Sequence, residues 1–173
     1  MQYISFFTAT ILNWKHLLLD DRYKDIIISS MKFLVADERA SIYAFVIMPN
    51  HIHLVWKIAN NRKKEDVQRD FLKYTAQKIK LKLKDEDPDK LKSFYVGAKD
   101  REYQFWERKP LTSRLPNEEI IVQKINYIHA NPIKGKWNLC NEFIDYKYSS
   151  ASFYYKETCE WDFLTHYAGA LFE

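Results

Sequence analysis

The sequence predicts an α+β fold: an antiparallel sheet of the ferredoxin-like, split βαβ type with helices packed on one face. Two apolar stretches joined by a tight turn indicate a central hairpin, and amphipathic stretches on either side indicate long helices. The predicted elements follow the order β-α-β-β-α-β-α, and a tail with weak periodicity comes after them. This order is typical of the ferredoxin-like group.

The hairpin has the clearest pattern. Residues 42–48 form a nearly continuous apolar run, which is typical of an inner strand. Pro49 and Asn50 then favour a turn. Residues 51–58 alternate between two faces, with Ile52, Leu54, Trp56 and Ile58 on one and His51, His53, Val55 and Lys57 on the other. The apolar face must belong to the core, so the two histidines point away from it.

Strands are also predicted over residues 3–12, 94–96 and 103–106, and a helix over residues 21–35. A second helix, over residues 66–84, has a core face predicted from Val67, Phe71, Tyr74 and either Ile79 or Leu81. A third helix begins just after Pro116 and is stopped by Pro132, and Ile121, Ile125 and Ile128 form its core stripe.

The chain of 173 residues fits one domain, with 47% hydrophobic residues, only 3 Gly and 5 Pro. We expect residues 1–134 to form this domain and residues 135–173 an extension packing on or near it. Cys140 and Cys159 form no CxxC pair, which disfavours a zinc knuckle and fits a reducing compartment. No signal-peptide pattern or membrane-spanning apolar run is present, so a cytoplasmic protein without membrane association is expected.

The net charge of +4 is by itself weak support for a nucleic-acid partner. Its distribution is more informative, because residues 57–84 contain ten basic and three acidic residues. An ordinary solvated helix face could also carry these charges. The residues predicted to contact phosphates are Arg62, Lys63, Lys64, Arg69 and Lys73.

His51 and His53 are separated by one residue in a predicted strand, so their imidazoles lie side by side. Two adjacent imidazoles can chelate a divalent cation. The alternative is a pair of unrelated strand histidines facing solvent, which is the commoner meaning of an isolated H-x-H sequence.

Tyr127 and Asn131 lie one helical turn apart, on the flank of the predicted isoleucine stripe. A boundary tyrosine and a C-capping asparagine are the alternatives for this pair. Together with the histidines, however, an amide oxygen would complete a metal site that keeps positions open for a phosphodiester oxygen and water. A phenol has a pKa of about 10 and is a weak nucleophile at pH 7, so such a metal would assist it.

Two segments of the sequence resemble the REP-associated tyrosine transposases, a group of single-tyrosine HUH transposases. Residues 48–55, Met-Pro-Asn-His-Ile-His-Leu-Val, are similar to the HUH motif, and residues 127–134, Tyr-Ile-His-Ala-Asn-Pro-Ile-Lys, are similar to the tyrosine helix. Residues 71–75 and 145–151 also look similar, and the likeness extends over about residues 3–153. The tail beyond about residue 156 matches no pattern.

This resemblance implies that Tyr127 is the nucleophile and that His51, His53 and Asn131 hold Mg²⁺ or Mn²⁺. It implies a transposase that nicks and rejoins single-stranded DNA through a 5′-phosphotyrosine and recognises hairpin DNA, as a monomer or a homodimer. Residues 1–134 would then be the catalytic domain.

Three other functions remain open at this point. A non-cleaving DNA-hairpin-binding regulatory protein would keep the fold, and a small metallohydrolase would use metal-bound water in place of Tyr127. An RRM-type RNA-binding domain shares the element order, but none of the three glycines lies in its glycine-aromatic motif.

His129 is expected to be structural, because it does not share the helix face of Tyr127. His16 is expected to lie on the surface, because it has no partner in the sequence. Aromatic residues at strand spacing usually belong to the core. Four of them could instead stack on unpaired bases: Trp14, Tyr103, Phe105 and Trp106.

Overall fold

The computed structural model describes residues 2–156 and 160–171. Its main sheet contains four antiparallel strands in the order β2 (Ala40–Met48), β3 (His51–Ile58), β1 (Ser5–Thr10) and β6 (Leu111–Arg114). The first and third strands in the chain are therefore neighbours at the centre of the sheet. This arrangement confirms the predicted α+β, ferredoxin-like class.

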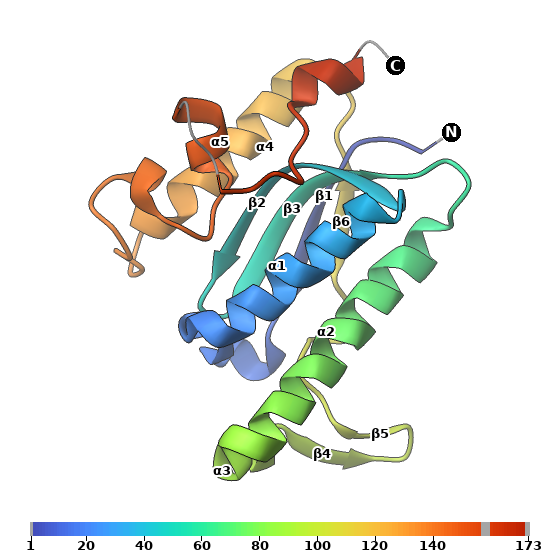
Figure 1. Cartoon of the computed structure of the whole chain (residues 1–173), viewed down its shortest axis with the longest axis vertical. Coiled ribbons are helices and arrows are strands. Elements are labelled where there is room, and N and C mark those ends of the chain that lie inside the picture. Colours follow the sequence, from blue (N-terminus) through green and yellow to red (C-terminus); the bar gives the residue numbers. More distant parts are fainter. Residues whose placement is uncertain (1, 157–159, 172–173) are drawn as a thin grey trace.

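Two long helices, α1 (Asp21–Ala36) and α2 (Lys64–Glu86), lie side by side over one face of the sheet (Figure 1). On this face the rings of Phe7 and Trp56 are 5.0 Å apart, and Phe71 from α2 packs against both. Helix α4 (Glu118–Ala130) contacts β2 and β3 from the opposite face, where His53 and Tyr127 meet. The sheet is therefore covered on both sides, and the tyrosine helix lies on the histidine side.

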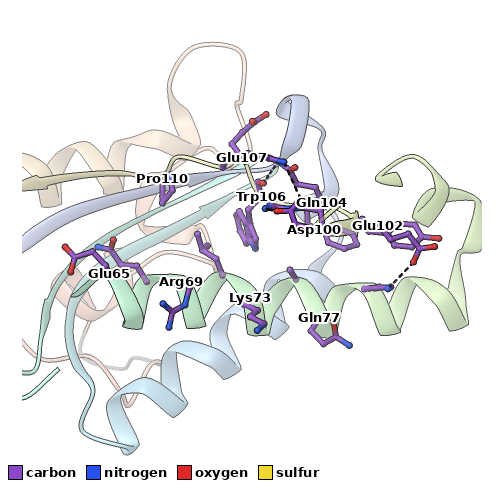
Figure 2. Close-up of a pocket in the computed structure, with 18 residues that line it drawn as sticks. Glu65, Arg69, Lys73, Gln77, Asp100, Glu102, Gln104, Trp106, Glu107 and Pro110 are labelled. Carbon is purple, nitrogen blue, oxygen red and sulfur yellow. Dashed lines mark hydrogen bonds and ion pairs between the residues drawn. The ribbon is translucent and has the colours of Figure 1, made fainter. Parts of the chain in front are cut away.

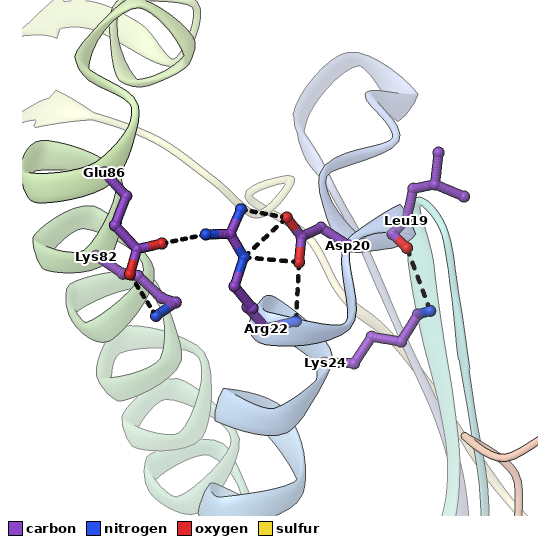
Figure 3. A network of polar contacts seen from close by, with 6 residues as sticks. All are labelled: Leu19, Asp20, Arg22, Lys24, Lys82 and Glu86. Atoms are coloured by element: carbon purple, nitrogen blue, oxygen red, sulfur yellow. Dashed lines mark hydrogen bonds and ion pairs between the residues drawn. The ribbon is translucent and has the colours of Figure 1, made fainter.

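A surface network joins the start of α1 to the end of α2 (Figure 3). Asp20 caps α1 by accepting a hydrogen bond from the backbone N–H of Arg22, and the Arg22 guanidinium pairs with both Asp20 and Glu86 at 2.6 Å. The Arg22 side chain holds the pKa of the Asp20 carboxyl below its usual value. Because these groups are largely exposed, we expect the network to orient the helices more than to stabilise the fold.

The core face of α2 differs in part from the prediction. Its buried stripe advances by four residues at a time, through Val67, Phe71, Thr75, Ile79 and Leu83. Tyr74, which was assigned to the core, is 50% exposed, and of the two alternatives Ile79 is buried whereas Leu81 is 48% exposed. Thr75 is accommodated inside because its hydroxyl donates to the Phe71 carbonyl at 3.0 Å, which satisfies a buried polar group locally.

The fourth strand of the main sheet was not among the predicted strands. Of the segments predicted after α2, residues 95 and 96 lie in β4 (Tyr95–Ala98) and Tyr103 lies in β5 (Arg101–Tyr103) of a separate hairpin, while Trp106 forms an isolated bridge with Ile11. The true edge strand is β6, which pairs with β1. It shows little alternation, and its first residue, Leu111, is 71% exposed, so its sequence carries almost no strand pattern.

The segment after α4 runs along the free edge of β2. The backbone N–H of Ile47 donates to the Tyr148 carbonyl, that of Ser150 to the Phe45 carbonyl, and that of Thr165 to the Ile42 carbonyl. The remaining short helices are α3 (Pro88–Lys92), α5 (Ala151–Tyr155) and 3-10 turns at Leu12–Trp14, Leu17–Leu19, Asn131–Ile133, Phe143–Asp145 and Tyr167–Leu171. Among the described residues, no helix has the length and apolarity needed to cross a bilayer.

Candidate active site

His51 and His53 lie side by side at the start of β3, with ring centroids 4.7 Å apart. Strand alternation places both on the face opposite Trp56, as predicted. They are not solvent-facing, because α4 and neighbouring loops cover them and leave the residues 8% and 6% exposed. The structure therefore excludes the alternative of two exposed histidines.

Each imidazole is held by a neighbouring side chain through its Nδ1 atom. Nδ1 of His51 lies 2.7 Å from Oδ1 of Asn50, whose amide nitrogen donates to the Trp14 carbonyl at 3.3 Å. Since a carbonyl oxygen only accepts, Nδ1 of His51 carries the proton and Nε2 keeps its lone pair. Nδ1 of His53 lies 2.7 Å from the hydroxyl of Thr8 on β1, which can hold that ring in the same tautomer. Partners of this kind orient metal-binding histidines in other proteins.

Burial keeps both rings neutral. It lowers the pKa of His51 to about 4, an effect partly offset by the Asn131 side chain. Burial also lowers the pKa of His53 to about 3, with smaller contributions from His51 and from the positive charge of Lys124. A neutral imidazole is the form that binds a cation, so neither ring needs to lose a proton at pH 7.

Tyr127 projects from α4 toward the histidines. Its ring centroid is 5.5 Å from that of His53 and 6.0 Å from that of Phe6 on β1. The residue is 42% exposed, and within the described part of the chain its hydroxyl has no hydrogen-bond partner. The phenol is therefore fixed by ring contacts, while its oxygen stays available to a bound molecule.

Asn131 ends α4 as the C-cap residue and is buried. Its amide nitrogen donates to the Tyr127 carbonyl at 2.9 Å, which leaves Oδ1 as the free end, and its side chain lies within hydrogen-bonding reach of His51. The helix thus brings together the four residues predicted for the site: Tyr127, His51, His53 and Asn131.

The donor set fits a divalent cation. The described residues contain no cluster of three or more His, Cys, Asp or Glu side chains, and the further oxygen beside the two imidazoles is the amide oxygen of Asn131. The Nε2 atoms of the two imidazoles and the Asn131 amide oxygen are donor atoms of the kind that bind divalent cations.

Several residues at the site were not predicted from the sequence. Lys124 places its ammonium 4.9 Å from the Phe6 ring centroid and 5.5 Å from that of Tyr127, and Lys134 lies 6.0 Å from the same phenol ring. Within the described residues neither lysine forms an ion pair. Lys124 precedes Tyr127 by one turn of the helix, and this spacing could have predicted that the two side chains are neighbours. No comparable spacing in the sequence predicts the positions of Asn50, Thr8 and Phe6.

The basic residues predicted for DNA contact lie elsewhere. Arg62 and Lys63 are exposed just before α2, whereas Lys64 donates to the Tyr3 hydroxyl at 3.1 Å. Arg69 and Lys73 line a groove of about 740 Å³ between α2 and residues 100–110 (Figure 2). Helix α2 covers the Trp56 face of the sheet, opposite the histidines. Arg69 pairs with Asp66 at 2.7 Å and with Asp70 at 3.1 Å.

The charges along this groove are largely balanced. Lys80 pairs with Glu102 at 3.6 Å, and Arg101 and Arg108 both pair with Asp100. A polyanion would have to displace these carboxylates, which makes the groove a weaker phosphate site than the surface around Lys124 and Lys134. The role of the α2 residues in DNA contact stays a prediction.

His129 has the structural role that was expected. It is 2% exposed, its Nε2 lies 2.9 Å from the Ser150 hydroxyl, and burial lowers its pKa to about 4. Phe105 and Trp106 also belong to the core, and Trp106 donates to the Thr75 hydroxyl at 3.0 Å. Of the four aromatic residues considered for base stacking, Trp14 is the one with a largely exposed ring, at 63%.

Solved structures share this architecture. A REP-associated tyrosine transposase bound to a REP hairpin matches with a TM-score of 0.63 and 19% sequence identity, over 86% of this chain and 76% of that one. The chain has the fold of a tyrosine transposase. A candidate transposase from Deinococcus radiodurans matches with a TM-score of 0.51 and 14% identity, over 74% of this chain and 89% of that one. No family model and no curated protein matches the chain.

At these identities the likeness concerns the fold. It agrees with the family that the two sequence motifs resemble, and the two motifs meet in space at one site. The motifs and the fold are therefore independent observations that point to the same class of protein.

Proposed function

We propose that this protein is a DNA strand-transfer enzyme of the REP-associated tyrosine transposase type, acting on single-stranded or hairpin DNA. One observation carries the proposal: the Tyr127 ring packs against His53, one of two buried, neutral imidazoles, and among the described residues the Tyr127 hydroxyl has no hydrogen-bond partner. The motif resemblance and the shared fold support it. The REP hairpin held by the first structural relative makes hairpin DNA the first substrate to test.

In the proposed reaction the Tyr127 oxygen attacks the scissile phosphorus while the bond from phosphorus to the 3′-oxygen breaks. The phenolic proton passes to solvent, and the departing 3′-oxygen becomes a hydroxyl by taking a proton from solvent. The product is a 5′-phosphotyrosine, which retains a phosphodiester and allows a later 3′-hydroxyl to rejoin the strand. Phe6 and His53 hold the phenol ring in place, and this fixed position lowers the entropic cost of reaching the phosphate.

We propose that His51, His53 and Asn131 hold Mg²⁺ or Mn²⁺. Such an ion, when bound, supplies Lewis-acid polarisation of the phosphoryl oxygen and stabilises charge on the leaving oxygen. Asn50 and Thr8 keep the two histidine rings in the binding orientation. Lys124 and Lys134 supply positive charge around the phenol where the phosphate must arrive.

The function is tested by incubating the full chain with labelled single-stranded DNA hairpins that carry single-stranded flanks, in the presence of Mn²⁺. We expect a covalent protein–DNA band on a denaturing gel, with the label on the 5′-phosphate side of the cut. Hairpin binding without cleavage would favour a regulatory protein of the same fold. Cut DNA without a protein adduct would favour a metal-dependent hydrolase.

The position of the DNA gives a separate prediction. On single strands each phosphate neutralised by the protein contributes about −0.7 to the slope of log affinity against log salt. We expect Lys124→Ala combined with Lys134→Ala to make this slope shallower by about 1.4, because both ammonium groups lie beside Tyr127 and, within the described part of the chain, form no ion pair. Fluorescence anisotropy with a labelled hairpin over a salt series measures it.

The matched control is the pair Arg69→Ala and Lys73→Ala, which removes the same number of charges from the α2 groove. We expect a smaller change there, since Arg69 is already paired with Asp66 and Asp70. A shallower slope for the α2 pair alone would place the DNA on the opposite face of the sheet.

A further inference from the structure

The turn that follows β1 holds Trp14 in an uncommon conformation. Asn13 and Trp14 both have φ of 56°, in the left-handed region that non-glycine residues rarely occupy. Three hydrogen bonds fix the turn, from the Trp14 N–H to the Ile11 carbonyl, from the Asn13 N–H to Glu107, and from the Asn50 amide to the Trp14 carbonyl. The outcome is a tryptophan residue that is 63% exposed. Strain that displays a large apolar ring to solvent is a mark of a binding function.

This indole stands beside the candidate metal ligand. Its centroid is 6.4 Å from that of His51, at an interplanar angle of 65°. A second indole, that of Trp137, lies 6.3 Å from the same histidine and 5.3 Å from His16. Two tryptophans therefore border His51, one from the turn after β1 and one from the segment after α4.

The charges around this pair favour a nucleic acid over an apolar protein surface. Lys136 places its ammonium 5.3 Å from the Trp137 ring centroid, and Lys134 lies near Tyr127. Both are exposed, and in the described ranges 2–156 and 160–171 neither forms an ion pair. Aromatic rings interleaved with free cations are what a single-stranded nucleic acid requires, since bases stack on the rings and phosphates pair with the charges.

We propose that Trp14, together with Trp137, forms a stacking site for an unpaired nucleobase adjoining the scissile phosphate. The inference rests on the proposed function and specifies its substrate: DNA with an unpaired nucleotide next to the cut. A phosphate held at His51 has its neighbouring base one sugar away, a distance comparable to the separation between His51 and either indole. Stacking of this kind is tolerant of base identity, so the site would select for an unpaired base more than for a sequence.

The test uses two fluorescent DNA hairpins with flanks of equal length, one flank of thymidines and the other of abasic nucleotides. Binding is measured with Mn²⁺ in a Tyr127→Phe background, so that no covalent product accumulates. We expect Trp14→Ala to weaken binding of the thymidine probe about tenfold or more and to leave the abasic probe unchanged. Trp14→Phe should retain most of the affinity, because a phenyl ring still stacks.

Tyr95→Ala is the matched control, since Tyr95 is 58% exposed but lies on β4, in the separate hairpin. Equal weakening of both probes by Trp14→Ala would overturn the stacking role and leave the indole a part in shaping the turn beside His51. If the Tyr127→Phe protein with Trp14 intact binds both probes equally, the proposed stacking site is wrong although DNA binding is confirmed. If it binds neither probe, the proposed function is wrong as well. Sedimentation velocity tests whether a second copy of the chain covers this surface instead. A dimer that Trp14→Ala converts to monomers, with DNA binding that does not depend on the bases of the flank, would make this surface an interface between two copies.

Discussion

Tyr127→Phe should abolish covalent attachment to DNA while leaving fold, metal binding and hairpin binding in place. The substitution removes one oxygen, and within the described residues that oxygen has no hydrogen-bond partner to lose. The ring keeps its contacts with Phe6 and His53. We therefore expect the free energy of unfolding to change by less than about 1 kcal/mol. Loss of the nucleophile should reduce adduct formation by about 10³-fold or more.

The measurement is a denaturing gel of wild type and variant with a labelled hairpin and Mn²⁺, together with thermal unfolding. The structure also identifies the matched control. Three tyrosines near the C-terminus are engaged through their hydroxyls, Tyr146 with the Ile47 carbonyl, Tyr148 with Asp25 and Tyr154 with the Tyr43 carbonyl. Burial raises the pKa of each of these phenols, which makes them poorer nucleophiles still.

Tyr155 is 55% exposed and is the appropriate control, as Tyr155→Phe. We expect wild-type adduct formation from it. A covalent band that survives in Tyr127→Phe and disappears in Tyr155→Phe would move the nucleophile to the C-terminal segment and overturn the assignment of Tyr127.

The parts of the fold that could be predicted are those whose sequence pattern comes from burial. The hairpin of β2 and β3 was predicted because residues 51–58 alternate between two faces and residues 42–48 form a nearly continuous apolar run. Strand β6 could not be predicted, because it is an exposed edge held by backbone pairing with β1, and backbone hydrogen bonds leave no side-chain pattern. Tyr74 was misassigned because the spacing on α2 allows two neighbouring stripes, and the contact with the sheet decides between them.

The candidate site likewise has residues that could be predicted from the sequence and residues that could not. His51, His53, Tyr127 and Asn131 could be predicted because local periodicity gives the face on which each lies, and the motif resemblance paired the two elements. The residues that orient them come from other parts of the chain and are brought close only by folding. Thr8 faces His53 because β1 and β3 pair in a register that sets those two residues opposite each other. Nothing in the sequence near Thr8 specifies this register.

Removing the histidines should have the other large effect. We expect His51→Ala and His53→Ala each to lose detectable Mn²⁺ binding and DNA cleavage, and EDTA to stop cleavage by the wild type until Mn²⁺ or Mg²⁺ is restored. Each substitution removes one of the three proposed protein ligands, and two ligands alone hold a divalent cation poorly. Isothermal titration with Mn²⁺ and the cleavage assay measure the two losses. Circular dichroism should show a folded protein, because both rings lie on the face of the sheet opposite Trp56 and take no part in its packing with Phe7 and Phe71.

Asn50→Ala separates orientation of His51 from ligation. The Asn50 oxygen fixes the proton of His51 on Nδ1 and leaves Nε2 free, so its loss allows the ring to turn and to change tautomer. We expect Mn²⁺ affinity to fall about 10- to 100-fold, less than for His51→Ala, with cleavage rescued at high Mn²⁺ concentration. His166→Ala, an exposed histidine on the C-terminal segment, serves as the control and should bind Mn²⁺ as the wild type does. Wild-type Mn²⁺ affinity in both His51→Ala and Asn50→Ala would place the cation elsewhere and leave Tyr127 to act without an ion at this pair.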